Sequence, residues 1–229
     1  PPGQDFVQVA GGRNHSLALK ANGSIVSWGR DIENQVANTP PGNDFVQVAG
    51  GKFHSLALRA DGSIVSWGVQ ARGLINGTPP GNDFVQVAGG GWHSLALRVD
   101  GSIVSWGDDS HRQVADTPSG AIFVKLAGGG WHSLALKEDG STVSWGRDTS
   151  NQVSNTPPGN DFLQVAGGGY HSLALKADGS IVSWGSDDYG EVSNSPPGTS
   201  FVQITGGQFH TLALREPGPT LSVTNLVAR

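Results

Sequence analysis

The sequence predicts an all-β protein, and three observations lead to that prediction. One motif returns every 39 residues along a chain of 229 residues, which is the signature of a repeat architecture. Each copy holds short runs of β-branched and aromatic residues bounded by glycine-rich turns, as strands do. No segment keeps the 3.6-residue period of an amphipathic helix. The copies fall at about 1–39, 40–78, 79–117, 118–156, 157–195 and 196–229, within a single domain 1–229.

Each copy is expected to contribute three short antiparallel strands. In the first copy the runs are residues 6–10, 15–19 and 24–28. The first run stops at Gly-Gly, and a tight hairpin joins the other two, because Asn-Gly or Asp-Gly supplies residues with positive φ. Two residue types mark the interval through the chain: His15, His54, His93, His132, His171 and His210 near the start of the second run, and Trp28, Trp67, Trp106, Trp145 and Trp184 at the end of the third.

These strands are apolar on both faces. Phe6 and Val7 are neighbours, as are Ile25 and Val26, and successive strand residues point to opposite sides of a sheet. Both sides therefore need a cover, and sheets packed face to face around a common axis provide it. We predict a β-propeller of six blades with three to four antiparallel strands each; the alternative is a seven-bladed parent that has been truncated.

The sixth copy is incomplete. After His210 the pattern breaks, yet residues 218–223 align at the repeat interval with residues 140–145, so a third strand is expected there with Val223 in place of tryptophan. We predict that the segment 1–10 meets this tail and closes the ring. Residues 221–229 fit equally well as the start of a neighbouring domain in a longer chain.

Composition narrows the possible functions. The 14 basic and 19 acidic residues give a net charge of −5 without any basic run, so nucleic acid is not an expected partner. No apolar stretch approaches the ~20 residues of a membrane helix, so we expect a soluble monomer that does not bind membranes. The chain has no cysteine and no methionine. We expect it to be a piece of a longer, extracellular or periplasmic product.

Neither a metal, a cofactor nor catalysis is expected. Equivalent positions on packed sheets are roughly 10 Å apart, too far for the repeated histidines to share an ion. Each histidine should instead open its strand and hydrogen-bond the backbone near the Gly-Gly turn. His15 and Ser16 are adjacent and so point to opposite faces, which does not build a nucleophile and base. The acidic connectors, such as Asp108 and Asp109, match no calcium loop and are expected to be solvated turns.

The chain resembles the regulator of chromosome condensation repeat family. The resemblance lies in units such as residues 87–107, VAGGGWHSLALRVDGSIVSWG, and extends over residues 1–223. Its short unit is similar to that of the propeller-type β-lactamase inhibitor protein and its bacterial relatives. The resemblance implies a β-propeller, usually with seven blades. The family's nucleotide exchange factor implies a projecting insertion, and the constant spacing here contains none, so exchange activity is not expected.

The two residues before each histidine vary while their surroundings stay constant: Arg13-Asn14, Lys52-Phe53, Gly91-Trp92, Gly130-Trp131, Gly169-Tyr170 and Gln208-Phe209. Five copies place an aromatic directly before the histidine: Phe53, Trp92, Trp131, Tyr170 and Phe209. Because the turn closes a strand end, these side chains should crowd one rim of the ring near its central opening. The resemblance implies the same, since plant ultraviolet receptors of the family use aromatics of this turn as a contact surface. Rigid rings provide a large contact area at small entropic cost.

These observations predict a non-catalytic binding module whose aromatic rim engages another protein. Two alternatives remain open: a lectin that stacks glycans on Trp92, Trp131 and Tyr170, and a recently amplified structural repeat domain without an evolved ligand. The near identity of the copies favours the second alternative. The aromatics themselves have a structural alternative, namely that they plug the channel or pack beneath the turn.

Overall fold

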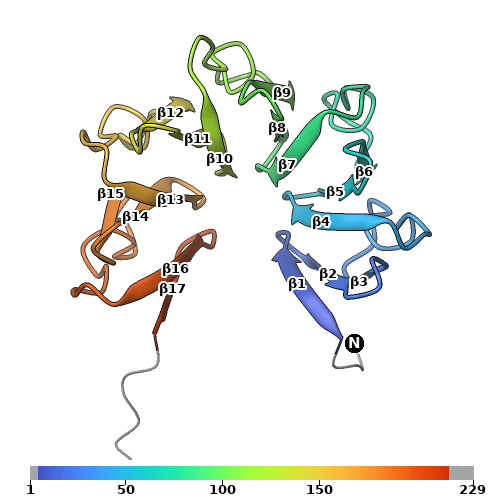
Figure 1. Ribbon diagram of the computed structural model, residues 1–229, viewed down its shortest axis with the longest axis horizontal. Helices are drawn as coiled ribbons and strands as arrows, with labels where there is room; N and C mark the ends of the chain where they lie inside the picture. Colours follow the sequence, from blue (N-terminus) through green and yellow to red (C-terminus); the bar gives the residue numbers. More distant parts are fainter. Residues whose placement is uncertain (1–4, 217–229) are drawn as a thin grey trace, which may run out of the picture.

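The computed structural model describes residues 5–216, and all regular elements in that range are β-strands. They form five three-stranded antiparallel sheets and one two-stranded sheet. Figure 1 shows these sheets arranged in chain order around a common axis, as the blades of a propeller. The predicted all-β, six-bladed fold is confirmed.

The strands are β1 (Phe6–Gly11), β2 (His15–Lys20), β3 (Ile25–Gly29), β4 (Phe45–Gly50), β5 (His54–Arg59), β6 (Ile64–Gly68), β7 (Phe84–Gly89), β8 (His93–Arg98), β9 (Ile103–Gly107), β10 (Phe123–Gly128), β11 (His132–Lys137), β12 (Thr142–Gly146), β13 (Phe162–Gly167), β14 (His171–Lys176), β15 (Ile181–Gly185), β16 (Phe201–Gly206) and β17 (Thr211–Arg215). The expected runs differ from them by one residue at the ends. The strand expected at residues 218–223 lies outside the described residues.

The hairpin between the second and third strands differs in detail from the expected turn. Gly23 has a φ of 81°, but Asn22 does not adopt positive φ. Asn22 instead accepts hydrogen bonds from the Ser24 amide (3.0 Å) and hydroxyl (2.7 Å) through Oδ1. A Cβ on Gly23 would also lie 2.2 Å from the Asn43 carbonyl oxygen of the next copy. Backbone conformation and packing therefore both require glycine there.

The hydrophobic core lies between the sheets. At the first junction, Leu17 and Leu19 of β2 pack against Phe45, Val48 and Trp67 of the next sheet. Three further clusters repeat this arrangement along the ring, and the last junction has the same cluster without a tryptophan among the described residues. The tryptophan therefore packs between blades, as predicted. It also makes a bond that the sequence did not reveal: its Nε1–H donates to a connector carbonyl of the preceding copy at 3.0 Å in each of four junctions.

The innermost strands are joined by side-chain amides. Neighbouring members of the series β1, β4, β7, β10, β13 and β16 contact one another around the central opening. Gln47 of β4 donates from Nε2 to the Val87 carbonyl (3.2 Å) and accepts from the Val87 amide at Oε1 (2.9 Å). The strands β4 and β7 belong to different sheets and do not pair through their backbones. The Gln47 side chain therefore makes the two hydrogen bonds to Val87 that a neighbouring strand would make. Lys125 takes the equivalent position in β10 and donates to the Leu163 carbonyl at 2.7 Å.

Replacing Gln47 with alanine is expected to lower the free energy of unfolding by about 1–2 kcal/mol, because both bonds to Val87 are lost while these backbone groups remain partly buried. Urea unfolding measures the change. The matched control is Gln203→Ala in β16, the sheet that has no following neighbour among the described residues. A cost at Gln203 as large as that at Gln47 would contradict the bridging role.

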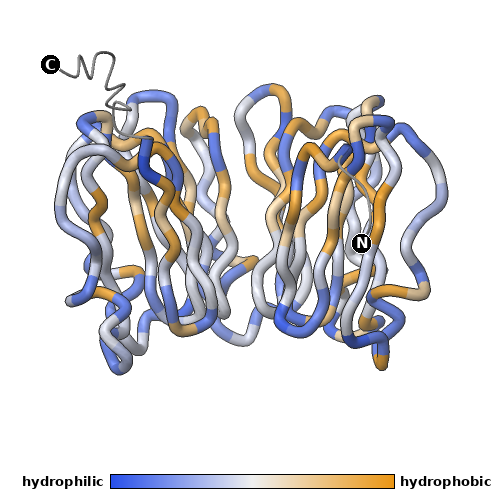
Figure 2. The backbone as a smooth tube through the Cα atoms, turned by 90° about the horizontal axis from the view of Figure 1, so that it is seen from below, coloured by the Kyte–Doolittle hydropathy of each residue, from blue (hydrophilic) through white to orange (hydrophobic). Residues whose placement is uncertain are grey.

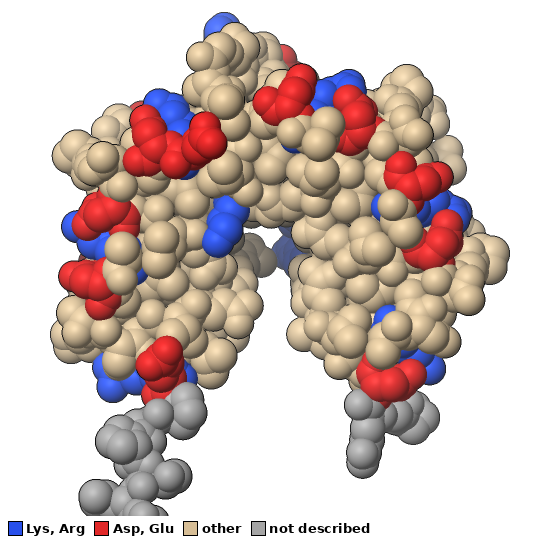
Figure 3. Space-filling model, viewed as in Figure 1, with Lys and Arg blue, Asp and Glu red and all other residues tan. Residues whose placement is uncertain are grey.

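The two ends of the described ring remain apart. Figure 1 shows β1 and β16 on opposite sides of an opening, and Figure 3 shows the same opening with side chains in place. Val9 is 73% exposed, although its counterpart Val48 is 1% exposed, and Leu212 is 60% exposed against 0% for Leu173. Contact between the segment 1–10 and the tail was predicted to close the ring. The tail, residues 217–229, lies outside the described residues.

Candidate functional site: an aromatic rim and a cationic channel mouth

The turn that holds the predicted site lies at one end of each sheet. In an antiparallel sheet of three strands, the end of the first strand, the start of the second and the end of the third lie at the same end of the sheet. His54 pairs with Gly68 in the register of β5 and β6, so the glycine-rich turn and the connector that follows β6 lie at the same end of the sheet. Figure 2 shows the strands running between two ends that carry the loops.

The predicted aromatics lie together on this end, and three of them form a continuous row. The ring centroids of Phe53 and Trp92 are 4.7 Å apart, and those of Trp92 and Trp131 are 6.4 Å apart with nearly parallel planes (26°). These are the separations of interacting aromatic pairs. Phe53, Trp92, Trp131 and Tyr170 are half-buried, and Phe209 is 44% exposed.

Connector residues complete this surface. Each of four rim aromatics contacts a side chain from the connector of the preceding copy: Arg72 lies 4.9 Å from the Trp92 ring, His111 5.3 Å from Trp131, Arg147 5.1 Å from Tyr170, and Tyr189 5.0 Å from Phe209. The sequence suggested two separate candidate surfaces, the aromatics and the connectors. The structure brings them together into one surface, which we call the aromatic rim.

The acidic side chains of the connectors accept hydrogen bonds from backbone amides of the same connectors. Asp31 accepts hydrogen bonds from the Val36 and Ala37 amides at 2.8 and 2.9 Å, and Asp109, Asp148 and Asp187 repeat this in later copies. Over residues 5–216, no three His, Cys, Asp or Glu side chains are grouped so that they could hold a metal ion. None of the described residues forms a helix long and apolar enough to cross a membrane.

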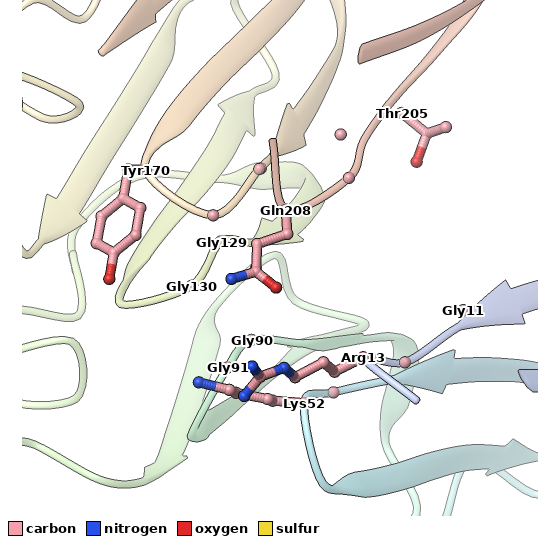
Figure 4. Close-up of a pocket in the computed structure, with 18 of the residues that line it drawn as sticks. Gly11, Arg13, Lys52, Gly90, Gly91, Gly129, Gly130, Tyr170, Thr205 and Gln208 are labelled. Atoms are coloured by element: carbon pink, nitrogen blue, oxygen red, sulfur yellow. The ribbon is translucent and has the colours of Figure 1, made fainter. Parts of the chain in front are cut away.

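A cavity of about 540 Å³ lies at the rim end of the central channel. Figure 4 shows its lining, which consists mostly of the Gly-Gly turns. A Cβ on Gly50 would lie 2.7 Å from the Gly11 backbone, and one on Gly51 would lie 2.1 Å from the His54 ring. A side chain at Gly50 would therefore clash with the neighbouring copy, and one at Gly51 would clash with the histidine of its own copy.

The residue after each Gly-Gly makes the channel mouth asymmetric. Gly91, Gly130 and Gly169 hold this position in three copies, and a Cβ on Gly91 would lie 2.2 Å from the Gly130 carbonyl oxygen. The other copies carry Arg13, Lys52 and Gln208, whose side chains line the cavity. The sequence marks these positions as variable, but only the structure shows that they surround one opening.

The repeated histidines make contacts that were not predicted. Each His–Ser dipeptide does point to opposite faces, but the histidine of one copy reaches the serine of the next: the distance from Nε2 to Oγ is 2.8 Å for His15 and Ser55 and 2.9 Å for His54 and Ser94. Its backbone carbonyl, rather than its ring, accepts the bond from the Gly-Gly turn, as with Gly51 and His54 (2.9 Å). Ser94 is fully buried, so no substrate reaches this hydroxyl.

Burial keeps these histidines neutral. Burial and, after it, the charge of a neighbouring histidine together lower the pKa of His54, His93 and His132 to about 3. The pKa values of His15 and His171 are lowered by burial as well. The ring therefore contains a row of uncharged imidazoles.

Comparison with known proteins gives a consistent result. The sequence profile of the Regulator of chromosome condensation (RCC1) repeat matches residues 6–35, 45–73, 84–113, 123–152 and 162–191. No curated protein sequence matches the chain. Solved structures do: the ectodomain of the Physcomitrella patens receptor kinase CR4 has a TM-score of 0.78 at 23% identity and covers 93% of this chain, which spans 62% of that ectodomain.

Two further structures show the same fold. Human WBSCR16 has a TM-score of 0.76 at 23% identity, with 92% of this chain and 72% of that chain covered. Yeast RCC1 (Prp20), solved with Kap60 bound to it, has a TM-score of 0.75 at 21% identity, with 92% of this chain and 68% of that chain covered. The likeness to the β-lactamase inhibitor protein stays a prediction.

Proposed function

Since the chain belongs to the Regulator of chromosome condensation (RCC1) repeat family, we propose that it is a protein-binding module that engages its partner through the aromatic rim. The continuous row of Phe53, Trp92 and Trp131 is the observation that carries this proposal. Yeast RCC1 (Prp20), which shares the fold, is bound to another protein, Kap60.

The chemistry of the rim suits a protein surface. Interfaces are enriched in tryptophan, tyrosine and arginine, and binding energy concentrates on a few such residues. The rim places these residue types side by side, for example Arg72 over Trp92 and Arg147 over Tyr170. Arg72 also pairs with Asp108, so its guanidinium is held in place before a partner arrives. Such preorganisation lowers the entropic cost of binding.

The two alternatives differ from this proposal in what they require. A lectin needs ring faces free for sugars, and the Trp92 ring already contacts Arg72, Phe53 and Trp131. A merely amplified scaffold predicts equivalent side chains in every copy, whereas the channel mouth carries Arg13, Lys52 and Gln208 beside three glycines. The first observation speaks against a lectin, and the second speaks against a scaffold without an evolved ligand.

Replacing Trp92 and Trp131 with alanine is expected to weaken partner binding at least about 30-fold, because hot-spot aromatics contribute about 2 kcal/mol or more. Partners retained on the immobilised native chain are identified, purified and measured by calorimetry against both proteins. The matched control is Val99→Ala, a 74% exposed apolar residue in the hairpin at the opposite end of its sheet.

Equal affinity of the rim variant and the native chain for every purified partner would overturn the proposal, provided that the variant melts as a folded domain. A glycan array is run in parallel. Glycan binding that is lost in the double variant, without any protein partner, would establish the lectin alternative instead.

A further inference from the structure

We infer that the channel mouth is a binding site for a small polyvalent oxyanion, carboxylate or phosphate in type, held between Arg13 and Lys52. The site adjoins the aromatic rim, because Trp131 and Tyr170 line the cavity and both cations lie over the Phe53 ring, but it concerns a small ligand rather than a protein. It rests on the cavity, on the two cations and on the glycines that leave space for a ligand.

The two cations enter the cavity together. Figure 4 shows the side chains of Arg13 and Lys52 running side by side, with the carboxamide of Gln208 and the hydroxyl of Tyr170 at the same cavity. They come from adjacent copies, at equivalent positions that are glycine in three others. Like charges placed together repel each other: burial and, after it, the nearby Arg13 charge lower the pKa of Lys52. An anion between them would remove this repulsion.

No carboxylate in the described part of the chain neutralises this pair. The five ion pairs found in residues 5–216 all use other cations. Besides Arg13 and Lys52, the cavity is lined by glycines, Trp131, Tyr170, Thr205, Gln208, His210 and Leu212, and neither Asp nor Glu is among the described residues that line it. In a chain of net charge −5, this is a local reversal of sign.

The remaining groups define the ligand class. A volume of about 540 Å³ is in the range of small-molecule sites. The Arg13 guanidinium presents several donors that match the two oxygens of a carboxylate or phosphate, and Lys52 adds a compact charge. Gln208 and Tyr170 supply neutral donors at the same cavity. The glycines offer no side chain that would fill this space, so a ligand of several heavy atoms fits.

Titration of the native chain with citrate, and separately with inorganic phosphate, tests the inference by calorimetry at low ionic strength, where screening is weak. The indole N–H resonance of Trp131, which lines the cavity, serves as a second readout. The test variant is Arg13→Gln with Lys52→Gln, because the sixth copy already carries glutamine at this position as Gln208. We expect its affinity for the better ligand to fall at least about tenfold, since two charge-assisted hydrogen bonds are lost.

The matched control is Lys20→Gln with Lys137→Gln, which also removes two positive charges but does so at the hairpin ends of β2 and β11. It should bind like the native chain. Retained binding in the control with loss in the test variant supports the site, and the stronger of the two anions identifies the carboxylate or phosphate type. Absence of binding to the native chain, or an equal affinity in both variants, overturns the inference without touching the aromatic rim.

Discussion

Leu95→Ala is expected to lower the free energy of unfolding by about 3 kcal/mol, whereas the same change at Leu212 should cost less than about 1 kcal/mol. Both leucines hold the same place in the repeat, on the second strand of their sheets. Leu95 is fully buried between sheets and packs among Phe123, Leu126 and Trp145, while Leu212 is 60% exposed. The pair therefore separates the effect of packing from that of local sequence.

Urea or thermal unfolding of the two variants measures the difference. Leu173, which is also fully buried, provides a second interior position, and its replacement should behave like that of Leu95. Equal losses at Leu95 and Leu212 would mean that the face of β17 is covered in solution, and the open arrangement of the two end sheets would be wrong.

Acidification from pH 7 to pH 5 is expected to destabilise the fold by about 6 kcal/mol. The folded pKa of His54, His93 and His132 is about 3, below the ordinary 6.5, so the unfolded chain binds more protons. The contribution of these histidines to the free energy of unfolding is therefore fully present above pH 6.5 and falls as the pH drops from there toward 3. Between these two pKa values, each histidine lowers the free energy of unfolding by about 1.4 kcal/mol for every pH unit of acidification, which amounts to about 2 kcal/mol at pH 5.

Denaturant unfolding at a series of pH values between 7 and 4 measures this slope. His93→Gln should reduce the proton uptake on unfolding by about one per molecule at pH 5, because one buried imidazole is gone. The matched control is His210→Gln, at the same repeat position but exposed. A stability that stays constant between pH 7 and 5 would show that these imidazoles are not buried as neutral groups.

Most of the fold could be predicted because it depends on the repeat interval and on the residue pattern within each copy. The interval between His54 and His93 set the number of copies, and glycines bounded the strands to within a residue. The packing of the repeated tryptophans between sheets was also correct, since a two-sided apolar sheet leaves no other place for them. The placement of the five rim aromatics at one end followed from strand direction alone.

The contacts between copies could not be predicted, because they join residues about 40 positions apart whose angle and distance depend on how the sheets pack. The bond from His54 to Ser94 is one such contact, and that from Gln47 to Val87 is another. The meeting of Arg72 with Trp92 belongs to the same class. The expected histidine bond to the turn was wrong for the ring, since the serine of the next copy is the nearer partner.

The nearest-neighbour arrangement of the sheets has a consequence for folding. β8 exchanges contacts with β7, β9 and β10, and the same pattern repeats along the ring. Cooperativity in such an array passes only from one unit to the next, so the outer units open more readily than the middle ones. Native-state amide exchange should accordingly be slowest in β8 and β11 and become progressively faster toward β2 and β17.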